Sequence, residues 1–352
     1  MNKKYGIWRH VIWTIILLIA LVVILLCDFG TNKQRDYRTP YDYINQGCVF
    51  LEPPTPQVSM EPQPEPTPQV WNGFSYFPTD EYYLQSPGVL RIFEGQTIND
   101  WTGTSATIEI PAEIDGVKML RVSMAFWWKD TLTTVSFPDS TMAIAARAFY
   151  DCANLNKVVI HDKLIFEGNP FIQCPSLKEI VVDEDSSRYC LIDDCLCDAD
   201  TQTLIVPTTK EMTKCYVPNG IMKIANYAYW GRTDLLEANF PDSIVEIGSS
   251  AFRGCANLSQ ITFPRSLARI GNEAFGHCNS LATIRIPEGV KIIEKYAFSN
   301  CENLCEVYLP TSIEKMEEYV FEGCPNIHLI VTEGSYAEKW AKENGLNYYY
   351  MI

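Results

Sequence analysis

Cysteine is the residue type that offers the most chemistry in this chain, which has 352 residues and 13 cysteines. Six of them recur three residues after a repeated aromatic residue: Cys152, Cys174, Cys255, Cys278, Cys301 and Cys324. A column of thiolates could bind a ladder of metal ions, and paired thiols could form disulfides. A buried thiol can also act as a small hydrophobe and a weak hydrogen-bond donor. Because each cysteine occupies an ordinary core position of the repeat, we expect buried thiols.

A second group of cysteines lies at or near an irregular segment, Tyr189–Lys210. Its members are Cys190, Cys195, Cys197 and Cys215. A disulfide among them would suit an oxidising environment outside the cell. Zinc is less favoured, because only one residue separates Cys195 from Cys197, whereas zinc sites usually have two to four. The sequence leaves the state of these thiols open.

The other chemically active residues form no catalytic motif that we recognise. The histidines are His10, His161, His277 and His328, and none lies in a nucleophile or metal-ligand motif. The irregular segment also contains four aspartates: Asp193, Asp194, Asp198 and Asp200. They lack the glycine and the closing glutamate of a calcium-binding EF-hand loop. We therefore predict no catalytic residues, no cofactor and no metal site.

The strongest candidates for binding a partner directly follow the repeated aromatic residue. They are Trp127, Trp128, Tyr150 and Trp230. Exposed tryptophan and tyrosine are enriched at interaction hot spots. These rings could instead pack against an N-terminal cap, and the sequence leaves both uses open. Two further candidates, Arg285 and Tyr308, belong to the open face of the predicted strands, which is the usual binding surface of a solenoid.

An internal repeat with a period of 23 residues must position these side chains. Its clearest copy, Ile247–Pro264, reads IGSSAFRGCANLSQITFP. We call the aromatic residue of each copy its landmark, and the landmarks are Phe126, Phe149, Phe171, Tyr229, Phe252, Phe275, Phe298 and Phe321. A period in the twenties with Leu and Ile at fixed offsets is typical of leucine-rich repeats. We predict a repeat solenoid, mostly β or α/β, in which short parallel strands stack.

Each copy contains one short strand with alternating apolar residues, so that one face is buried and the other is open. The predicted strands are Thr107–Pro111, Thr134–Pro138, Lys157–His161, Glu179–Asp183, Lys214–Pro218, Glu237–Pro241, Gln260–Pro264, Thr283–Pro287, Glu306–Pro310 and His328–Thr332. A following proline ends many of them, because it cannot donate to the ladder. Stacked copies should bury their Ala–Phe pairs in a continuous core.

One interruption breaks the period between Phe171 and Tyr229, which are 58 residues apart. In the extra segment Tyr189–Lys210, apolar runs flank Asp198–Gln202, a pattern that predicts a hairpin. We expect this hairpin to project from the stack. Because Tyr229 resumes the phase that Phe171 leaves, we also expect the core to run through the gap.

Both ends of the solenoid should be covered. Ser335 and Glu338 form a capping box, which predicts the start of a helix, and Gly345 is placed to end it. Tyr336, Trp340 and Ala341 would share its apolar face. At the other end, the aromatic segment Trp71–Gly103 should form the second cap.

The amino-terminal region predicts a membrane anchor. Val11–Cys27 has no charged residue, and its 17 residues reach the lower limit for a spanning helix. A cleaved signal peptide is the alternative, but no small-residue cleavage motif follows. Glu52–Pro68 contains seven prolines, which predicts an extended spacer.

These assignments divide the chain into six parts. They are a cytoplasmic tail (1–10), a transmembrane signal anchor (11–27), a Pro-rich extracellular spacer (28–70), an N-terminal cap (71–106), the solenoid (107–332) and a C-terminal cap of helix and strand (333–352). The net charge of -15 argues against a nucleic-acid partner, because phosphate backbones would be repelled.

Residues 95–350 resemble the BspA-type leucine-rich repeat family of surface proteins. The resemblance includes the entry phrase TSATIEIPAEIDGVKMLRVSMAF, the interrupting hairpin and the closing phrase GSYAEKWAKENGLNYY. The chain departs from the pattern at Lys129 and Arg232, where other copies have Cys, and within the Ala–Phe pairs at Pro170, Tyr229 and Val320.

The resemblance implies a secreted or membrane-tethered protein, because members of the family are typically so. Some members act as adhesins. Lys and Arg counts on the two sides of the anchor do not decide its orientation, so the resemblance places the repeats outside the cell. We expect a single-pass membrane protein whose partner is a protein or glycan of the cell envelope or of a host surface. The alternatives are a structural envelope protein and an accessory binding domain for an enzyme on another chain.

Overall fold

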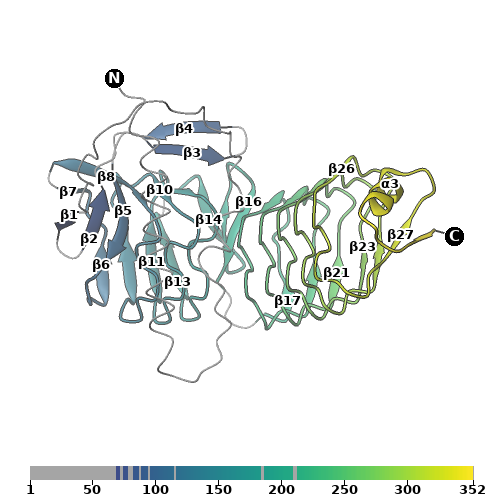
Figure 1. Cartoon of the computed structure of the whole chain (residues 1–352). Coiled ribbons are helices and arrows are strands. Elements are labelled where there is room, and N and C mark those ends of the chain that lie inside the picture. The colour runs from purple at the N-terminus through teal and green to yellow at the C-terminus, as the bar shows by residue number, and fades with distance from the viewer. Residues whose placement is uncertain are drawn as a thin grey trace, which may run out of the picture. The chain divides into compact units, whose positions relative to one another are not determined.

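The computed structural model describes residues 69–71, 74–77, 82–86, 89–93, 96–114, 116–183, 186–208 and 212–351 (Figure 1). The predicted anchor at 11–27 lies outside the described residues, and so does all of the predicted spacer except its last two residues. Within the described part of the chain, no helix is long and apolar enough to cross a membrane.

One row of strands confirms the predicted solenoid. Its members are β6 (Thr107–Glu109), β9 (Thr134–Ser136), β11 (Lys157–Ile160), β13 (Glu179–Val182), β17 (Lys214–Cys215), β19 (Glu237–Asn239), β21 (Gln260–Thr262), β23 (Thr283–Arg285), β25 (Glu306–Tyr308) and β27 (His328–Val331). All ten begin where the sequence predicts. Within each sheet they pair in parallel, as Glu237 does with Gln260 one period later. We call this row the first sheet, although it divides after β13 and after β21.

A second row of strands was not predicted. It consists of two-residue strands that precede the landmark loops: β10 (Ala143–Ile144), β12 (Ile165–Phe166), β18 (Lys223–Ile224), β20 (Glu246–Ile247), β22 (Arg269–Ile270), β24 (Ile292–Ile293) and β26 (Lys315–Met316). They also pair in parallel at one period, as Ile247 does with Ile270. We call this row the second sheet, although it divides between β12 and β18. Two residues are too few to show the alternation of apolar and polar residues that identifies a strand in a sequence, so these strands could not be predicted.

The landmark rings stack in a column inside the solenoid. Phe275 lies between Phe252 and Phe298, with ring centroids 5.2 and 5.4 Å away and the planes within 6° of parallel. All three rings are fully buried. At such spacings, stacked aromatic rings contribute beyond the burial of their area, so the column joins each coil to the next.

The six cysteines of the repeat lie beside this column and act as donors. Each thiol donates to the carbonyl of the landmark in the preceding coil, as Cys278 does to Phe252 O at 3.2 Å and Cys301 to Phe275 O at 3.2 Å. Burial raises the pKa of the Cys278 thiol, so it stays protonated and can donate. The eleven described cysteines are all free. The interpretation as buried thiols is confirmed for this column, with Cys174 half-buried.

The irregular segment forms a three-stranded meander instead of one hairpin. β14 (Tyr189–Ile192), β15 (Cys195–Asp198) and β16 (Thr203–Pro207) are antiparallel, and β16 then pairs in parallel with β18. The predicted turn between β15 and β16 is present. The expected projection is wrong, because pairing with β18 builds the meander into the second sheet (Figure 1).

The meander forms a wall between two hydrophobic cores. Leu196 of β15 packs into the N-terminal core, whereas its neighbours Cys195 and Cys197 pack into the C-terminal core. This division follows from the alternation of side chains along a strand. The predicted continuous core is therefore corrected to two cores that share β15 and β16.

The solenoid is covered at its C-terminal end by a helix and a strand. α3 (Tyr336–Glu343) begins at Ser335, whose side chain accepts the Glu338 N–H, and Trp340 packs edge-on against the landmark Phe321. Tyr336 does not join the buried face: it is 38% exposed, and its hydroxyl accepts the Met316 N–H. β28 (Tyr348–Tyr350) adds a last parallel strand beside β27.

The N-terminal strands extend the second sheet. β1 (Gln69–Trp71), β2 (Phe74–Phe77) and β5 (Gln96–Trp101) lead to β8 (Val117–Val122), which pairs with β10 and with β7 (Glu113–Ile114). β3 (Tyr82–Ser86) and β4 (Val89–Phe93) form a separate hairpin. Trp101 is buried and packs against Phe126, so it covers the first landmark.

Phe275→Ala should destabilise the repeat domain by about 3–5 kcal/mol, because it opens a cavity between two stacked rings. Cys278→Ala should cost less, about 1 kcal/mol for the lost thiol hydrogen bond and a small loss of packing. Denaturant unfolding of both variants measures the two costs. Equal losses would contradict the dominant role of the ring column.

Candidate functional site

The stack changes where the coil of Phe171 meets the coil of Tyr229, a junction that we call the seam. Elsewhere a landmark N–H bonds to the next coil, as Phe149 N does to Pro170 O at 2.9 Å. At the seam, Phe171 N–H donates instead to the Asn169 side-chain oxygen at 2.8 Å. The Asn169 amide nitrogen then donates to Tyr227 O and Ala228 O, both at 3.2 Å. A hydrogen bond to the buried Asn169 side chain therefore replaces the main-chain hydrogen bond that other landmarks donate to the next coil.

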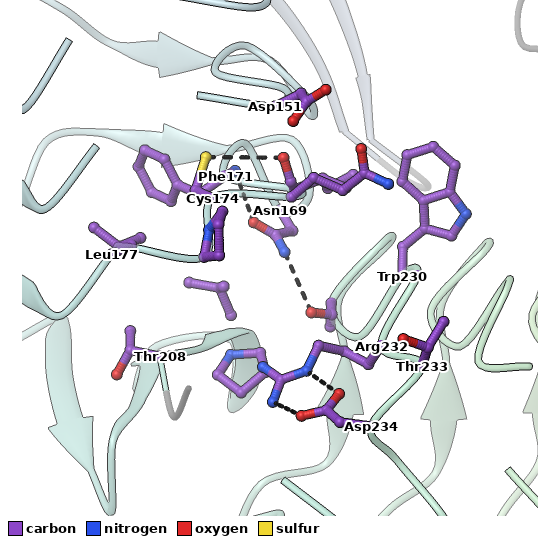
Figure 2. A pocket seen from close by; sticks show the side chains of 17 residues that line it. Asp151, Asn169, Phe171, Cys174, Leu177, Thr208, Trp230, Arg232, Thr233 and Asp234 are labelled. Carbon is purple, nitrogen blue, oxygen red and sulfur yellow. Dashed lines mark hydrogen bonds and ion pairs between the residues drawn. The ribbon is translucent and has the colours of Figure 1, made fainter. Parts of the chain in front are cut away.

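A cleft of about 420 Å³ opens at the seam (Figure 2). One wall is the landmark loop that contains Phe171 and Gln173, and the other is the loop from Ala228 to Asp234. The end of β16 contributes Val206 and Pro207, and Thr208 directly follows it. The volume lies within the range of about 300–1,000 Å³ that is usual for small-molecule sites.

Arg232 and Asp234 form an ion pair on one wall of the cleft (Figure 2). Arg232 Nε lies 2.9 Å from Asp234 Oδ1, and Nη2 lies 2.8 Å from Oδ2. Burial opposes ionisation of Asp234, but the bonds from Arg232 and from the Met212 N–H hold its pKa below the usual value. Arg232 stands where other coils have a cysteine, so the departure seen in the sequence gives the cleft a planar, charged edge.

Four of the predicted binding residues come together beside the cleft, and we call them the aromatic cluster: Trp127, Trp128, Tyr150 and Trp230. The Trp127 ring lies 5.3 Å from Trp128 and 5.4 Å from Tyr150. Tyr150 lies 5.6 Å from Trp230 across the seam. Trp230 also lines the cleft, so the cluster and the cleft form one continuous surface.

Trp128 has an unusual backbone for a large residue. Its φ is 59°, and its side chain is 57% exposed. Glycine occupies the same position, two residues after the landmark, at Gly231, Gly254 and Gly323. The left-handed conformation costs a residue with a Cβ roughly 1–2 kcal/mol. Aspartate, asparagine and histidine, which three other coils have at this position, tolerate it better. Tyr227, Tyr296 and Tyr319 adopt the same conformation two residues before their landmarks, so the exposure of Trp128, and not its backbone, marks it as a candidate for binding.

Gln173 occupies the equivalent position in the coil before the seam, with φ of 57°. Its amide nitrogen lies 3.8 Å from the point where a Cβ on Gly231 would stand. The Gln173 side chain therefore reaches over the coil that follows the seam. Sequence analysis missed this residue and the whole cleft.

Arg285 and Tyr308 lie on the first sheet, apart from the aromatic cluster. They are register partners in β23 and β25, and the Arg285 guanidinium carbon lies 3.5 Å from the Tyr308 ring centroid. The Arg285 guanidinium and the Tyr308 ring thus form a cation–π contact with each other. Binding by the six candidate residues stays a prediction. The alternative, in which the aromatic rings pack against the N-terminal cap, depends mainly on side chains outside the described residues.

The sequence leaves the state of the thiols at the irregular segment open, and in the structure all four of them are free. Cys190 and Cys197 are partners across β14 and β15, and both are free thiols. Burial raises the pKa of Cys195 and of Cys215 to about 12. Within the described residues, no group of three or more His, Cys, Asp or Glu side chains is placed to hold a metal ion.

Comparison with known families identifies the repeat. The model for the BspA type leucine rich repeat region matches residues 106–215 and 222–338, in six copies. The gap between the two matches lies just after the meander. A search of the curated proteins finds no match.

Several solved structures are similar over most of their length. A leucine rich cell surface protein from Faecalibacterium prausnitzii is 21% identical, with a TM-score of 0.43, over 79% of this chain and 98% of that chain. The pneumococcal vaccine antigen PcpA is 15% identical, with a TM-score of 0.43, over 82% and 99%. The T. pallidum leucine rich repeat protein is 20% identical, with a TM-score of 0.29, over 77% and 95%.

Asn169→Ala should destabilise the repeat domain by about 2–3 kcal/mol, because it leaves the buried Phe171 N–H without its acceptor. Asn257→Ala is the matched control, since this exposed asparagine makes a single bond to Thr233 O in a regular coil. Its cost should stay below about 1 kcal/mol. Denaturant unfolding compares the two, and hydrogen exchange at Phe171 locates the loss. Equal costs would show that Asn169 does not hold the seam.

Proposed function

The chain belongs to the BspA-type leucine-rich repeat family, and from this premise we propose that it is a membrane-tethered binding protein with its repeats outside the cell. Its partner is a protein or glycan of the cell envelope or of a host surface. A solenoid of this kind presents an extended surface for partners. The absence of a recognisable catalytic motif favours binding over catalysis.

The aromatic cluster is the observation that supports this proposal best. Trp128 is more than half exposed, and its neighbours fix its position. Trp127 is itself held by a bond from its indole N–H to Arg147 O at 2.5 Å. Tryptophan and tyrosine that are rigidly held at a surface are typical of binding hot spots. A partner therefore meets rings that lose little conformational entropy on binding.

The anchor and the proline-rich spacer support tethering. They would hold the repeats close to the membrane, because the stretch between the anchor and β1 has 41 residues and spans at most about 150 Å when fully extended. An envelope component or a neighbouring membrane protein is therefore favoured over a distant host receptor. If the chain were only structural, no single surface would be preferred for contacts.

A photo-crosslinking residue, p-benzoylphenylalanine, in place of Trp128 should capture one dominant partner in intact cells, because it stands at the proposed binding surface. The matched control carries the same residue in place of Leu236, which is 44% exposed but lies next to β19. Mass spectrometry of the adducts identifies the partner. Similar, diffuse adducts from both positions would contradict a defined site and favour the structural role.

The orientation of the anchor can be tested separately. An antibody against the repeat domain should label cells whose membrane is intact, after digestion of any thick wall, because we place the repeats outside. An antibody against a cytoplasmic protein serves as the control for membrane integrity. Labelling that requires permeabilised membranes would refute the extracellular placement.

A further inference from the structure

We propose that the seam cleft and the adjoining aromatic cluster bind a neutral oligosaccharide, with a sugar ring lying against Trp230. This proposal rests on the proposed binding function and narrows it to one class of ligand. A sugar ring has an apolar face of C–H groups and a rim of hydroxyls. Its site must therefore offer an aromatic face beside polar groups that can each make two hydrogen bonds.

Trp230 meets the first requirement. It stands at the mouth of the cleft and is half-buried (Figure 2). Tyr150 and Tyr227 contact its ring at 5.6 and 6.2 Å, and the Arg253 guanidinium lies 5.8 Å from its centroid. These contacts fix the indole before a ligand arrives, so stacking on it costs little conformational entropy.

The cleft walls meet the second requirement. Arg232 and Asp234 present planar groups with paired donors or acceptors, and Thr208 and Thr233 add hydroxyls (Figure 2). The amide of Gln173, which also lines the cleft, is a further planar group. The lining also includes apolar side chains, among them Phe171, Leu177 and Val206. A site that combines planar polar groups with apolar surface suits a ligand that carries hydroxyls around an apolar face.

The charge of the site selects against acidic sugars. Asp151 and Asp234 line the cleft together with a single cation, Arg232, among the described residues. The chain as a whole carries -15. Hydrogen bonds from Arg232 and the Met212 N–H hold the pKa of Asp234 below the usual value despite burial, so at neutral pH its carboxylate is ionised. A uronic acid or sialic acid would meet net negative charge.

The aromatic cluster extends the site beyond one sugar ring. From Trp230 the contacts continue through Tyr150 to Trp127 and Trp128. Trp128 and Gln173 both keep a left-handed backbone where three other coils have glycine. Trp128 is exposed at the far end of these contacts, and Gln173 lines the cleft, so we assign further sugar-binding positions along the cluster.

The full chain in lipid nanodiscs should bind at least one of three neutral probes, chitohexaose, maltohexaose or mannohexaose, in titration calorimetry. An acidic probe, oligogalacturonate, should bind at least about tenfold more weakly. Trp230→Ala and Gln173→Gly should each weaken the neutral probe by about tenfold or more. Nanodiscs are needed because sugar-headed detergents would compete for the site.

Two controls separate a lost site from a lost fold. Gln173→Gly keeps the left-handed backbone, since glycine stands at this position in other coils, so its Tm should not fall. Tyr319→Ala removes a half-exposed ring in a distant coil and should leave the affinity unchanged.

The proposal is overturned if no neutral probe binds, if neither variant weakens binding, or if the acidic probe binds more tightly. If the crosslinker at position 128 captures a protein and no glycan probe binds, this inference is refuted and the proposed function still stands. Failure of both the crosslink and the glycan probes would remove both.

Discussion

The structure depends on one constraint: each coil must satisfy its backbone and bury its ring against the next coil at a fixed period. No coil has a core of its own, because a landmark such as Phe275 is packed against rings of the neighbouring coils, namely Phe252, Phe263 and Phe298. The thiol column obeys the same rule, since each sulfur donates one coil back. Stability of such a stack is a sum of interfaces between neighbours, and the ends need Trp101 and Trp340 as covers.

At the seam, the two sides of the coil connect to the next coil in different ways. The second sheet takes in the three strands of the meander, whereas the landmark loops on either side of it stay in contact through Asn169. One side of the stack thus gains strands that the other side lacks, and the loops touch at Asn169 but leave a space beside it. The cleft is the consequence, and the residues around it are released from the repeat pattern.

The difference between the regular coils and the seam explains which features the sequence predicts well and which it does not. The starts of the first-sheet strands and the buried thiols follow from local spacing, as in Cys278 three residues after Phe275. The second sheet escapes prediction because Ile270 and its equivalents are single buried residues in two-residue strands. The cleft escapes because it depends on how Gln173 and Arg232, distant in sequence, meet across a gap. Arg232 in place of cysteine is the one clue in the sequence.

Left-handed backbone conformations recur along the whole stack, as at Tyr296 and Tyr319 in regular coils. A large residue with a left-handed backbone weakens its own coil by roughly 1–2 kcal/mol, but a stack with many interfaces can carry that loss. At this position the other described coils have glycine, as at Gly254 and Gly323, or the more tolerant Asp151, His277 and Asn300. Trp128 and Gln173 belong to neither group; Trp128 is part of the aromatic cluster, and Gln173 lines the cleft. Because the backbone conformation fixes where each side chain points, the repeat supplies a rigid frame, and its departures determine where a partner can bind.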